Sequence, residues 1–132
     1  MTSSSPLRLF TLEYNTITNS ISPHVRYISP DNVLHDLYKI LNCQLVTCTE
    51  IEVNGKLFDV YSDDEALLKD KSAPNLYIDD DLIIFGSVAF AKSDEKGKLV
   101  GLSHEEVQLL WNFSRLQFPK LLNYIEKQRR KF

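Results

Sequence analysis

The dipeptide Asn54-Gly55 constrains the fold of this chain more than any other feature of its sequence. It separates residues 45–53, in which apolar and polar side chains alternate, from a second short run at 56–61. Both central residues of a type I′ turn need a positive φ, which asparagine and glycine adopt at low cost. The sequence therefore predicts a tight β-hairpin over these two runs.

Two further regions predict strands. Residues 7–14 have strand-like composition, residues 15–23 are rich in turn formers, and residues 25–28 are typical of a short partner strand, so we expect a second hairpin with a looser loop. Residues 81–91 contain the apolar run Leu82-Ile83-Ile84-Phe85, which is typical of a strand covered on both faces. We expect this strand at the centre of the sheet, with Gly86 marking a bulge or a close backbone approach.

A first helix is predicted to start at Ser29-Pro30, because serine caps free amides and proline fits the first helical position. Its apolar face then recurs at helical spacing and should end near Asn42. That face consists of Leu34, Leu37, Tyr38 and Leu41.

A second helix is predicted from the spacing of Ser103 and Glu106, which matches a capping box. Pro119 should kink or break this helix, since proline removes one helical hydrogen bond and clashes with the preceding turn. Residues 120–131 would then form a terminal helix or a loose extension.

Together these elements predict one α+β domain over residues 1–132, in which a mixed or antiparallel sheet of four to five strands packs against two main helices. Residues 1–6 are expected to be a frayed terminus and residues 119–132 a C-terminal helical extension. A chain of 132 residues is long enough to bury one core without cross-links.

Two absences restrict the cellular setting that we expect. No run reaches the roughly 18 apolar residues of a membrane-spanning helix, so no membrane partner is predicted. Cys43 and Cys48 are the only cysteines, too few for a disulfide framework or a structural zinc site. A reducing, cytoplasmic location follows as the prediction.

Charge is distributed unevenly along the chain. Residues 50–81 hold ten acidic residues against three lysines, whereas residues 107–132 hold six basic residues against Glu126 alone. An acidic middle repels nucleic acid, and the basic end attracts phosphates or an acidic protein surface. The aromatic platforms that read unstacked bases do not accompany the basic end, so a nucleic-acid partner is not expected.

Sequence signatures of catalysis are missing. The chain has no nucleophile elbow, phosphate-binding glycine loop, dinucleotide fingerprint or paired histidines at metal spacing. The acidic clusters at 63–65 and 79–81 lack the alternating oxygens and the central glycine of a calcium loop. We therefore predict no catalytic residues, no metal and no cofactor, with a small metal-dependent hydrolase as the less favoured alternative.

Binding residues are predicted among the tyrosines, acids and loop asparagine between residues 61 and 77. If several aromatic side chains share one exposed patch, an interface or a nucleotide pocket becomes the leading interpretation. The predicted binding set is Tyr61, Asp63, Asp64, Glu65, Asn75 and Tyr77.

The C-terminal segment is predicted to dock on another surface, because its apolar edge is too short to hold a helix in isolation. Docking on its own domain is one possibility, and contact with another subunit or a target protein is the other. The predicted interface residues are Leu121, Tyr124, Ile125, Arg129 and Arg130.

The order of motifs between residues 30 and 113 resembles a family of small proteins of unknown function found mainly in bacteriophages, plasmids and mobile elements of Gram-positive bacteria. That family usually has glycine where Ala66 stands. The matching segments are 31–38 (DNVLHDLY), 51–53 (IEV), 58–61 (FDVY), 63–68 (DDEALL), 82–86 (LIIFG) and 102–106 (LSHEE).

This resemblance implies a setting rather than an active site. Accessory proteins of phages commonly act stoichiometrically, so the resemblance implies a binding protein that inhibits a host defence system in the cytoplasm of the host cell. The partner would be a host protein or, alternatively, a nucleotide-like signalling molecule that the chain sequesters. The C-terminal segment also offers a contact for a homo-oligomer.

Overall fold

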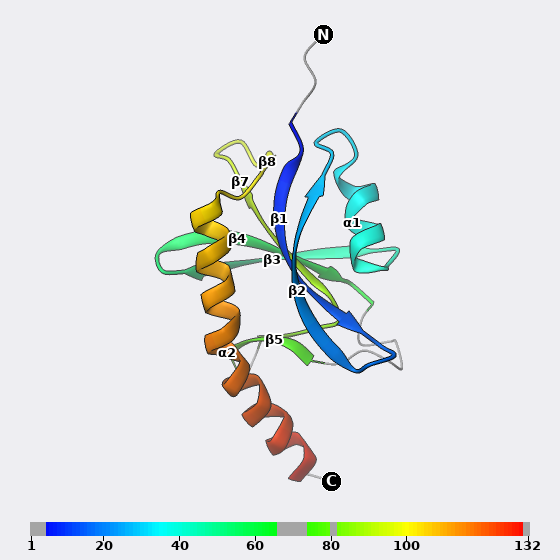
Figure 1. The fold of residues 1–132 in the computed structure, drawn as a ribbon, viewed down its shortest axis with the longest axis vertical. Helices are drawn as coiled ribbons and strands as arrows, with labels where there is room; N and C mark the ends of the chain where they lie inside the picture. Colours follow the sequence, from blue (N-terminus) through cyan, green and yellow to red (C-terminus); the bar gives the residue numbers. More distant parts are fainter. Residues whose placement is uncertain (1–4, 66–73, 80–81, 131–132) are drawn as a thin grey trace.

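The computed structural model describes residues 5–65, 74–79 and 82–130. It confirms the predicted α+β class: an antiparallel sheet is covered by one helix on each face (Figure 1). The main sheet has six strands, in the order β2-β1-β7-β4-β3 with the short β8 beside β7, and β5 and β6 form a separate pair. The strands are β1 (Leu7–Asn15), β2 (Ser20–Ile28), β3 (Val46–Val53), β4 (Lys56–Asp63), β5 (Pro74–Asp79), β6 (Leu82–Phe85), β7 (Val88–Ser93) and β8 (Leu99–Val100).

Within the described residues two helices cover the sheet, α1 (Val33–Leu41) on one face and α2 (His104–Arg130) on the other. Successive side chains of each strand point to opposite faces of the sheet, so the core is divided into one layer under α1 and one under α2. Leu9 of β1 and Ala89 of β7 pack with Leu37 and Leu41 of α1, whereas Phe10 and Phe90 pack with Leu110 of α2. Each central strand therefore supplies apolar side chains to both layers.

The hairpin of β3 and β4 forms as predicted. Val53 pairs directly with Lys56, so that Asn54 and Gly55 alone make the turn. Their φ angles are 51° and 81°, the positive values that a type I′ turn needs.

The prediction of one central strand over 81–91 is wrong. The chain turns at Gly86, where φ is 77°, and divides the segment into β6 and β7. β7 is the central strand and is buried over residues 88–91, whereas β6 leaves the main sheet to pair with β5. The Gly86 carbonyl accepts a hydrogen bond of 2.6 Å from the side chain of Asn75.

The first helix begins later than predicted. Its N-cap is Asn32. The Ser29 hydroxyl, predicted to cap the helix, instead accepts a hydrogen bond of 3.2 Å from the backbone N–H of Asp31. The Ser29 amide donates to the Asp36 carboxylate at 2.8 Å, so the segment before the helix is a turn braced by the helix itself. The helix ends, as predicted, at Asn42, whose φ is 51°.

The capping box at the start of α2 is confirmed. The Ser103 amide donates to Glu106 Oε1 at 2.8 Å, and the Glu106 amide donates to Ser103 Oγ at 3.1 Å. Lys92 Nζ of β7 lies 2.8 Å from Glu106 Oε2, which ties this cap to the central strand. Burial raises the pKa of Glu106, but hydrogen bonds from Lys92 and the Ser103 amide outweigh burial and hold it below its usual value of 4.5.

Pro119 does not break α2, which runs as one helix through residue 130. Pro119 is exposed, so the helical carbonyl that loses its partner at Arg115 faces water rather than a dry interior. Gln117 and Leu121, on either side of the proline, are buried and hold both halves of the helix against the domain. Residues 119–130 therefore continue α2 instead of forming a separate extension.

Substitution of Gly55 tests the turn. A Cβ added at this position would have no atom within 4 Å, so Gly55→Val should destabilise the fold through its positive φ alone, by about 1–3 kcal/mol. Gly55→Asn is the matched control and should cost less, because asparagine tolerates this φ. Urea denaturation measures both, and equal stability of Gly55→Val and the parent protein would contradict the type I′ turn.

Adjacent leucines in α2 test whether residues beyond Pro119 belong to the core. Leu121 is 1% exposed and Leu122 is 50% exposed. Leu121→Ala should lower the free energy of unfolding by about 2–5 kcal/mol, and Leu122→Ala by about 1 kcal/mol or less. Similar losses in the two variants, measured by chemical denaturation, would argue against the docked position of this part of α2.

The pH dependence of stability tests the Lys92–Glu106 pair. Because the pKa of Glu106 is lowered in the folded chain, its contribution is present above the usual value of 4.5 and is lost as pH falls through the lowered value. Glu106→Gln should therefore be less stable than the parent at pH 7, and the difference should shrink as the pH falls below 4.5. A difference independent of pH in denaturation curves would exclude this ionic contribution.

Candidate ligand-binding pocket

A pocket of about 300 Å³ lies where α2 passes the β1–β2 hairpin and the separate strand β5. Beyond its first turns α2 packs against β5 rather than flat against the edge strand β2, which leaves a space between helix and edge. The pocket is lined by Leu12, Ile21, Pro23, Asn75, Trp111, Ser114, Arg115, Gln117 and Phe118.

The walls of the pocket are apolar. Leu12 and Pro23 face each other across the β1–β2 ladder, and both side chains lie on the face that α2 covers. Trp111 forms the opposite wall, and its ring meets Phe10 edge-on, with 6.4 Å between ring centres and 90° between ring planes. Phe10 is buried in the core, so the indole is held in place from behind.

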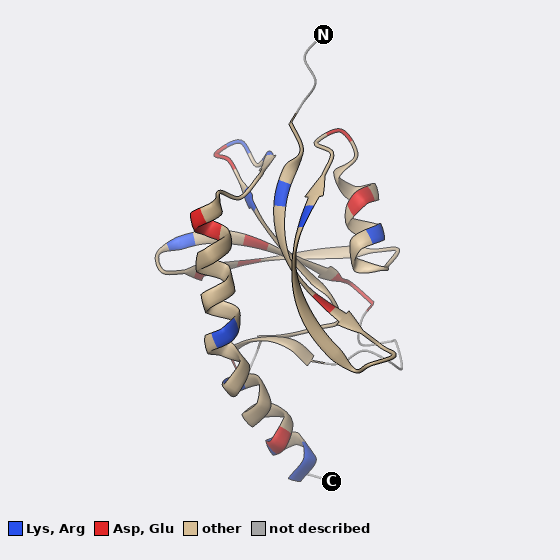
Figure 2. Ribbon diagram, in the orientation of Figure 1, with Lys and Arg blue, Asp and Glu red and all other residues tan. Residues whose placement is uncertain are grey.

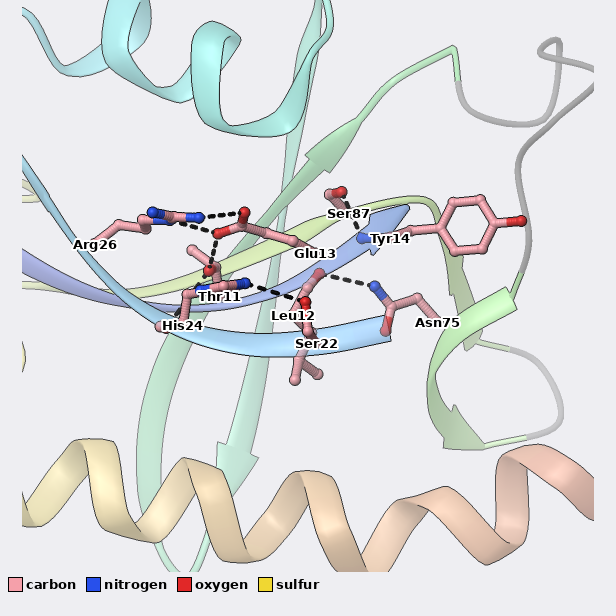
Figure 3. A network of polar contacts seen from close by, with 9 residues as sticks. All are labelled: Thr11, Leu12, Glu13, Tyr14, Ser22, His24, Arg26, Asn75 and Ser87. Carbon is pink, nitrogen blue, oxygen red and sulfur yellow. Dashed lines mark hydrogen bonds and ion pairs between the residues drawn. The ribbon is translucent and has the colours of Figure 1, made fainter. Parts of the chain in front are cut away.

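Asn75 supplies a buried polar group to the pocket. Its Nδ2 donates to the carbonyls of Leu12 at 2.9 Å and Gly86 at 2.6 Å. Its Oδ1 is buried and has no hydrogen-bond partner among the described residues. Figure 3 shows the amide nitrogen turned toward Leu12 and the oxygen turned toward α2. A buried acceptor of this kind costs about 1–3 kcal/mol unless a ligand or water supplies a donor.

The buried polar residues of α2 are already engaged with backbone groups. Gln117 Oε1 accepts a hydrogen bond of 2.8 Å from the backbone N–H of Tyr77, and Gln117 Nε2 donates one of 3.2 Å to the Ser114 carbonyl. The Ser114 hydroxyl donates its hydrogen to the Trp111 carbonyl at 2.7 Å, so its oxygen keeps only lone pairs for another partner. Ser114 Oγ and Asn75 Oδ1 are therefore the hydrogen-bond acceptors at the inner end of the pocket.

Arg115 places a cation at the rim of the pocket. It is exposed, and no described residue forms an ion pair with it. Residues 107–125 contain Arg115 and Lys120 but no acid, and in Figure 2 acidic colour on α2 appears only near its two ends. The middle of α2 thus presents positive charge beside an apolar wall.

A second depression of about 380 Å³ adjoins the first and shares Pro23 and Trp111 with it. We call the two together the β2–α2 trough. The second part is lined by Phe10, Pro23, His24, Val25, Val107, Gln108 and Trp111.

The structure brings only part of the predicted binding set to this trough. Asn75 lines it. Tyr77 supports it from behind: its backbone N–H donates a hydrogen bond to Gln117 Oε1, and its ring contacts that of Tyr124, with 6.2 Å between ring centres. Tyr61 instead packs with the α1 layer, where burial is the main cause that raises its pKa to about 12.

The predicted acids Asp63, Asp64 and Glu65 lie elsewhere. Asp63 and Asp64 border a separate depression of about 200 Å³ between β3, β4 and β6. The Glu65 amide donates to the Asp63 carboxylate at 2.9 Å, so this acid braces its own turn. The described residues contain no group of three or more histidine, cysteine or acidic side chains that could hold a metal ion.

The predicted interface residues also divide. Leu121 is buried inside its own chain and is not available to a partner, which corrects that part of the prediction. Tyr124 and Ile125 are half-buried, whereas Arg129 and Arg130 are exposed, with Arg130 Nε 3.6 Å from Glu126. No helix within the described ranges is long and apolar enough to cross a membrane.

Sequence reasoning did not predict most of the trough. Trp111 and Arg115 lie four residues apart and so share one helix face, and they stand in a segment without acids, which is the signal that could have drawn attention to them. The apolar wall of β2 has no comparable signal. Comparisons with protein-family models, curated proteins and solved structures give no match to this chain.

Proposed function

We propose that this chain is a non-catalytic binding protein that captures one nucleotide-like molecule in the β2–α2 trough. The observation that carries the proposal is the buried Asn75 Oδ1, which has no hydrogen-bond partner among the described residues and belongs to a residue that lines a pocket with an indole wall and Arg115 at its rim. A base with a donor group would satisfy this oxygen, and its phosphate would meet Arg115.

The size and composition of the pocket support a small ligand. Small-molecule sites are mostly apolar clefts of about 300–1,000 Å³ with a few placed polar groups. The pocket, at about 300 Å³, is large enough for one base. The Trp111 ring provides an aromatic surface for a planar base.

The polar groups of the trough support binding rather than turnover. Nucleophilic catalysis needs a hydroxyl or thiol beside a base that takes its proton. Ser114 donates its hydrogen to a backbone carbonyl and not to a base. Ser22 does lie beside a base, with its hydroxyl 3.0 Å from His24 Nε2, but Ser22 lines neither part of the trough. Stoichiometric capture is therefore the activity that we propose.

The sequence resemblance implies a phage setting, and in that setting capture of a nucleotide-like molecule has a biological role. In that setting the chain would act in the cytoplasm of the host cell and inhibit a defence system by removing its nucleotide-like signal. This part of the proposal rests on the resemblance alone.

Inhibition of a host protein is the second candidate, and it is favoured by the exposed surface of α2. Leu116 is 75% exposed and Leu122 is 50% exposed, and the basic residues Arg129 and Arg130 follow. Exposed apolar side chains next to positive charge suit an acidic protein surface.

Titration calorimetry with the four ribonucleoside 5′-monophosphates tests the first candidate. At least one should bind with a stoichiometry near one and change the fluorescence of Trp111. Arg115→Gln should weaken binding about tenfold, because a charge-assisted hydrogen bond is lost. Lys120→Gln is the matched control: it removes an exposed cation of the same helix that does not line the pocket, and it should bind as the parent does.

Two results would refute the proposal. One is the absence of binding of all four nucleotides at millimolar concentration to folded protein. The other is chemical conversion of a nucleotide by substoichiometric protein, which would make the chain an enzyme.

A further inference from the structure

We infer that the pocket selects a base carrying an exocyclic amino group over the same base without it. This inference rests on the proposed function and specifies the class of ligand. It follows from the fixed orientation of the Asn75 amide and the Ser114 hydroxyl at the inner end of the pocket.

The first step is the orientation of the Asn75 amide. Its nitrogen donates to two backbone carbonyls, those of Leu12 and Gly86. Rotation of the amide by 180° would place Oδ1 against both carbonyl oxygens, which accept hydrogen bonds and cannot donate them. Asn75 therefore offers the pocket an oxygen and no hydrogen.

The second step is the state of the neighbouring polar groups. The Ser114 hydroxyl hydrogen is engaged by the Trp111 carbonyl, so this side chain too offers lone pairs. Gln117 directs its oxygen to the Tyr77 amide and its nitrogen to the Ser114 carbonyl. A ligand atom that meets Asn75 Oδ1 must therefore bring its own hydrogen.

The third step is the position of the positive charge. Arg115 lies at the rim, one helical turn after Trp111, so the two side chains share a face of α2. The ligand that matches this order has a donor at its inner end, a flat apolar middle against the indole and an anionic group at the rim. An amino-bearing nucleotide has these three parts in this order.

The size of the selection follows from burial. A base without the amino group leaves Asn75 Oδ1 unsatisfied in a dry site, and a keto group there would set two acceptors against each other. We expect loss of the amino group to weaken binding at least about tenfold.

Matched pairs of nucleotides test the inference on the intact chain. AMP is compared with purine riboside 5′-monophosphate, GMP with IMP, and CMP with pyrimidin-2-one riboside 5′-monophosphate, each by titration calorimetry. In the pair that binds, the amino-bearing member should bind at least tenfold more tightly, and UMP should bind more weakly than that member.

A change at Asn75 links the selection to this residue. Asn75→Leu, if circular dichroism shows it to be folded, should bind the amino-bearing nucleotide no better than its partner, while Ser22→Ala, outside the pocket, should keep the selection. If Asn75→Leu does not fold, the nucleotide pairs still decide. Equal binding within the pairs, or tightest binding of UMP, would overturn this inference and leave the proposed function standing. Failure of all nucleotides to bind would instead refute the proposed function.

Discussion

The side-chain amide of Asn75 is the contact on which the arrangement of the two sheets depends. It joins the carbonyl of Leu12, in the main sheet, to that of Gly86, where the chain passes from β6 to β7. At this point the strand ladder is interrupted, and buried carbonyls that lose ladder partners need other donors. Asn75 supplies these donors. Nearby, the Ser87 hydroxyl accepts a hydrogen bond of 3.0 Å from the backbone N–H of Tyr14 (Figure 3). Side chains thus replace backbone pairing where β5 and β6 separate from the main sheet.

The position of α2 follows from contacts near both ends of its buried stripe. At its start, the capping box and Lys92 tie Glu106 to the central strand. Farther along, the Tyr77 amide donates to Gln117, and Leu121 is buried, so the helix follows β5 away from the main sheet. The edge strand β2 is left uncovered in part, and the β2–α2 trough is the space that results.

The side-chain amide of Asn75 belongs both to the contacts that hold the fold and to the candidate site. Asn75 satisfies two carbonyls with its nitrogen, and its buried oxygen, turned toward α2, has no hydrogen-bond partner among the described residues. A donor-bearing ligand would complete the hydrogen bonding of a residue that the architecture already requires. Departures from full polar satisfaction tend to occur at functional sites, which is why this residue, rather than the exposed acids, is central to the proposal.

Local signals in the sequence determined the elements whose formation depends on a few neighbouring residues. The turn at Asn54-Gly55 and the Ser103–Glu106 cap form as expected, because φ preferences and reach over three residues decide them. Tertiary contacts decided the rest. An apolar run such as Leu82–Phe85 is compatible with a central strand, and only the turn at Gly86 and the bond from Asn75 placed it in a second sheet.

The same distinction applies to Pro119 and to the candidate site. The cost of a proline in a helix is local, but burial of Gln117 and Leu121 offsets it, and that burial exists only once β5 is in place. Among the predicted binding residues, Asn75 alone lines the trough, because the trough is built from residues of β1, β2, β5 and α2 that lie far apart in sequence. Asn75 is 63 residues from Leu12, and Tyr77 is 40 residues from Gln117. Composition and periodicity predict the helix or strand to which a residue belongs. A pocket depends instead on how several elements pack together, and that packing is decided by the whole core at once.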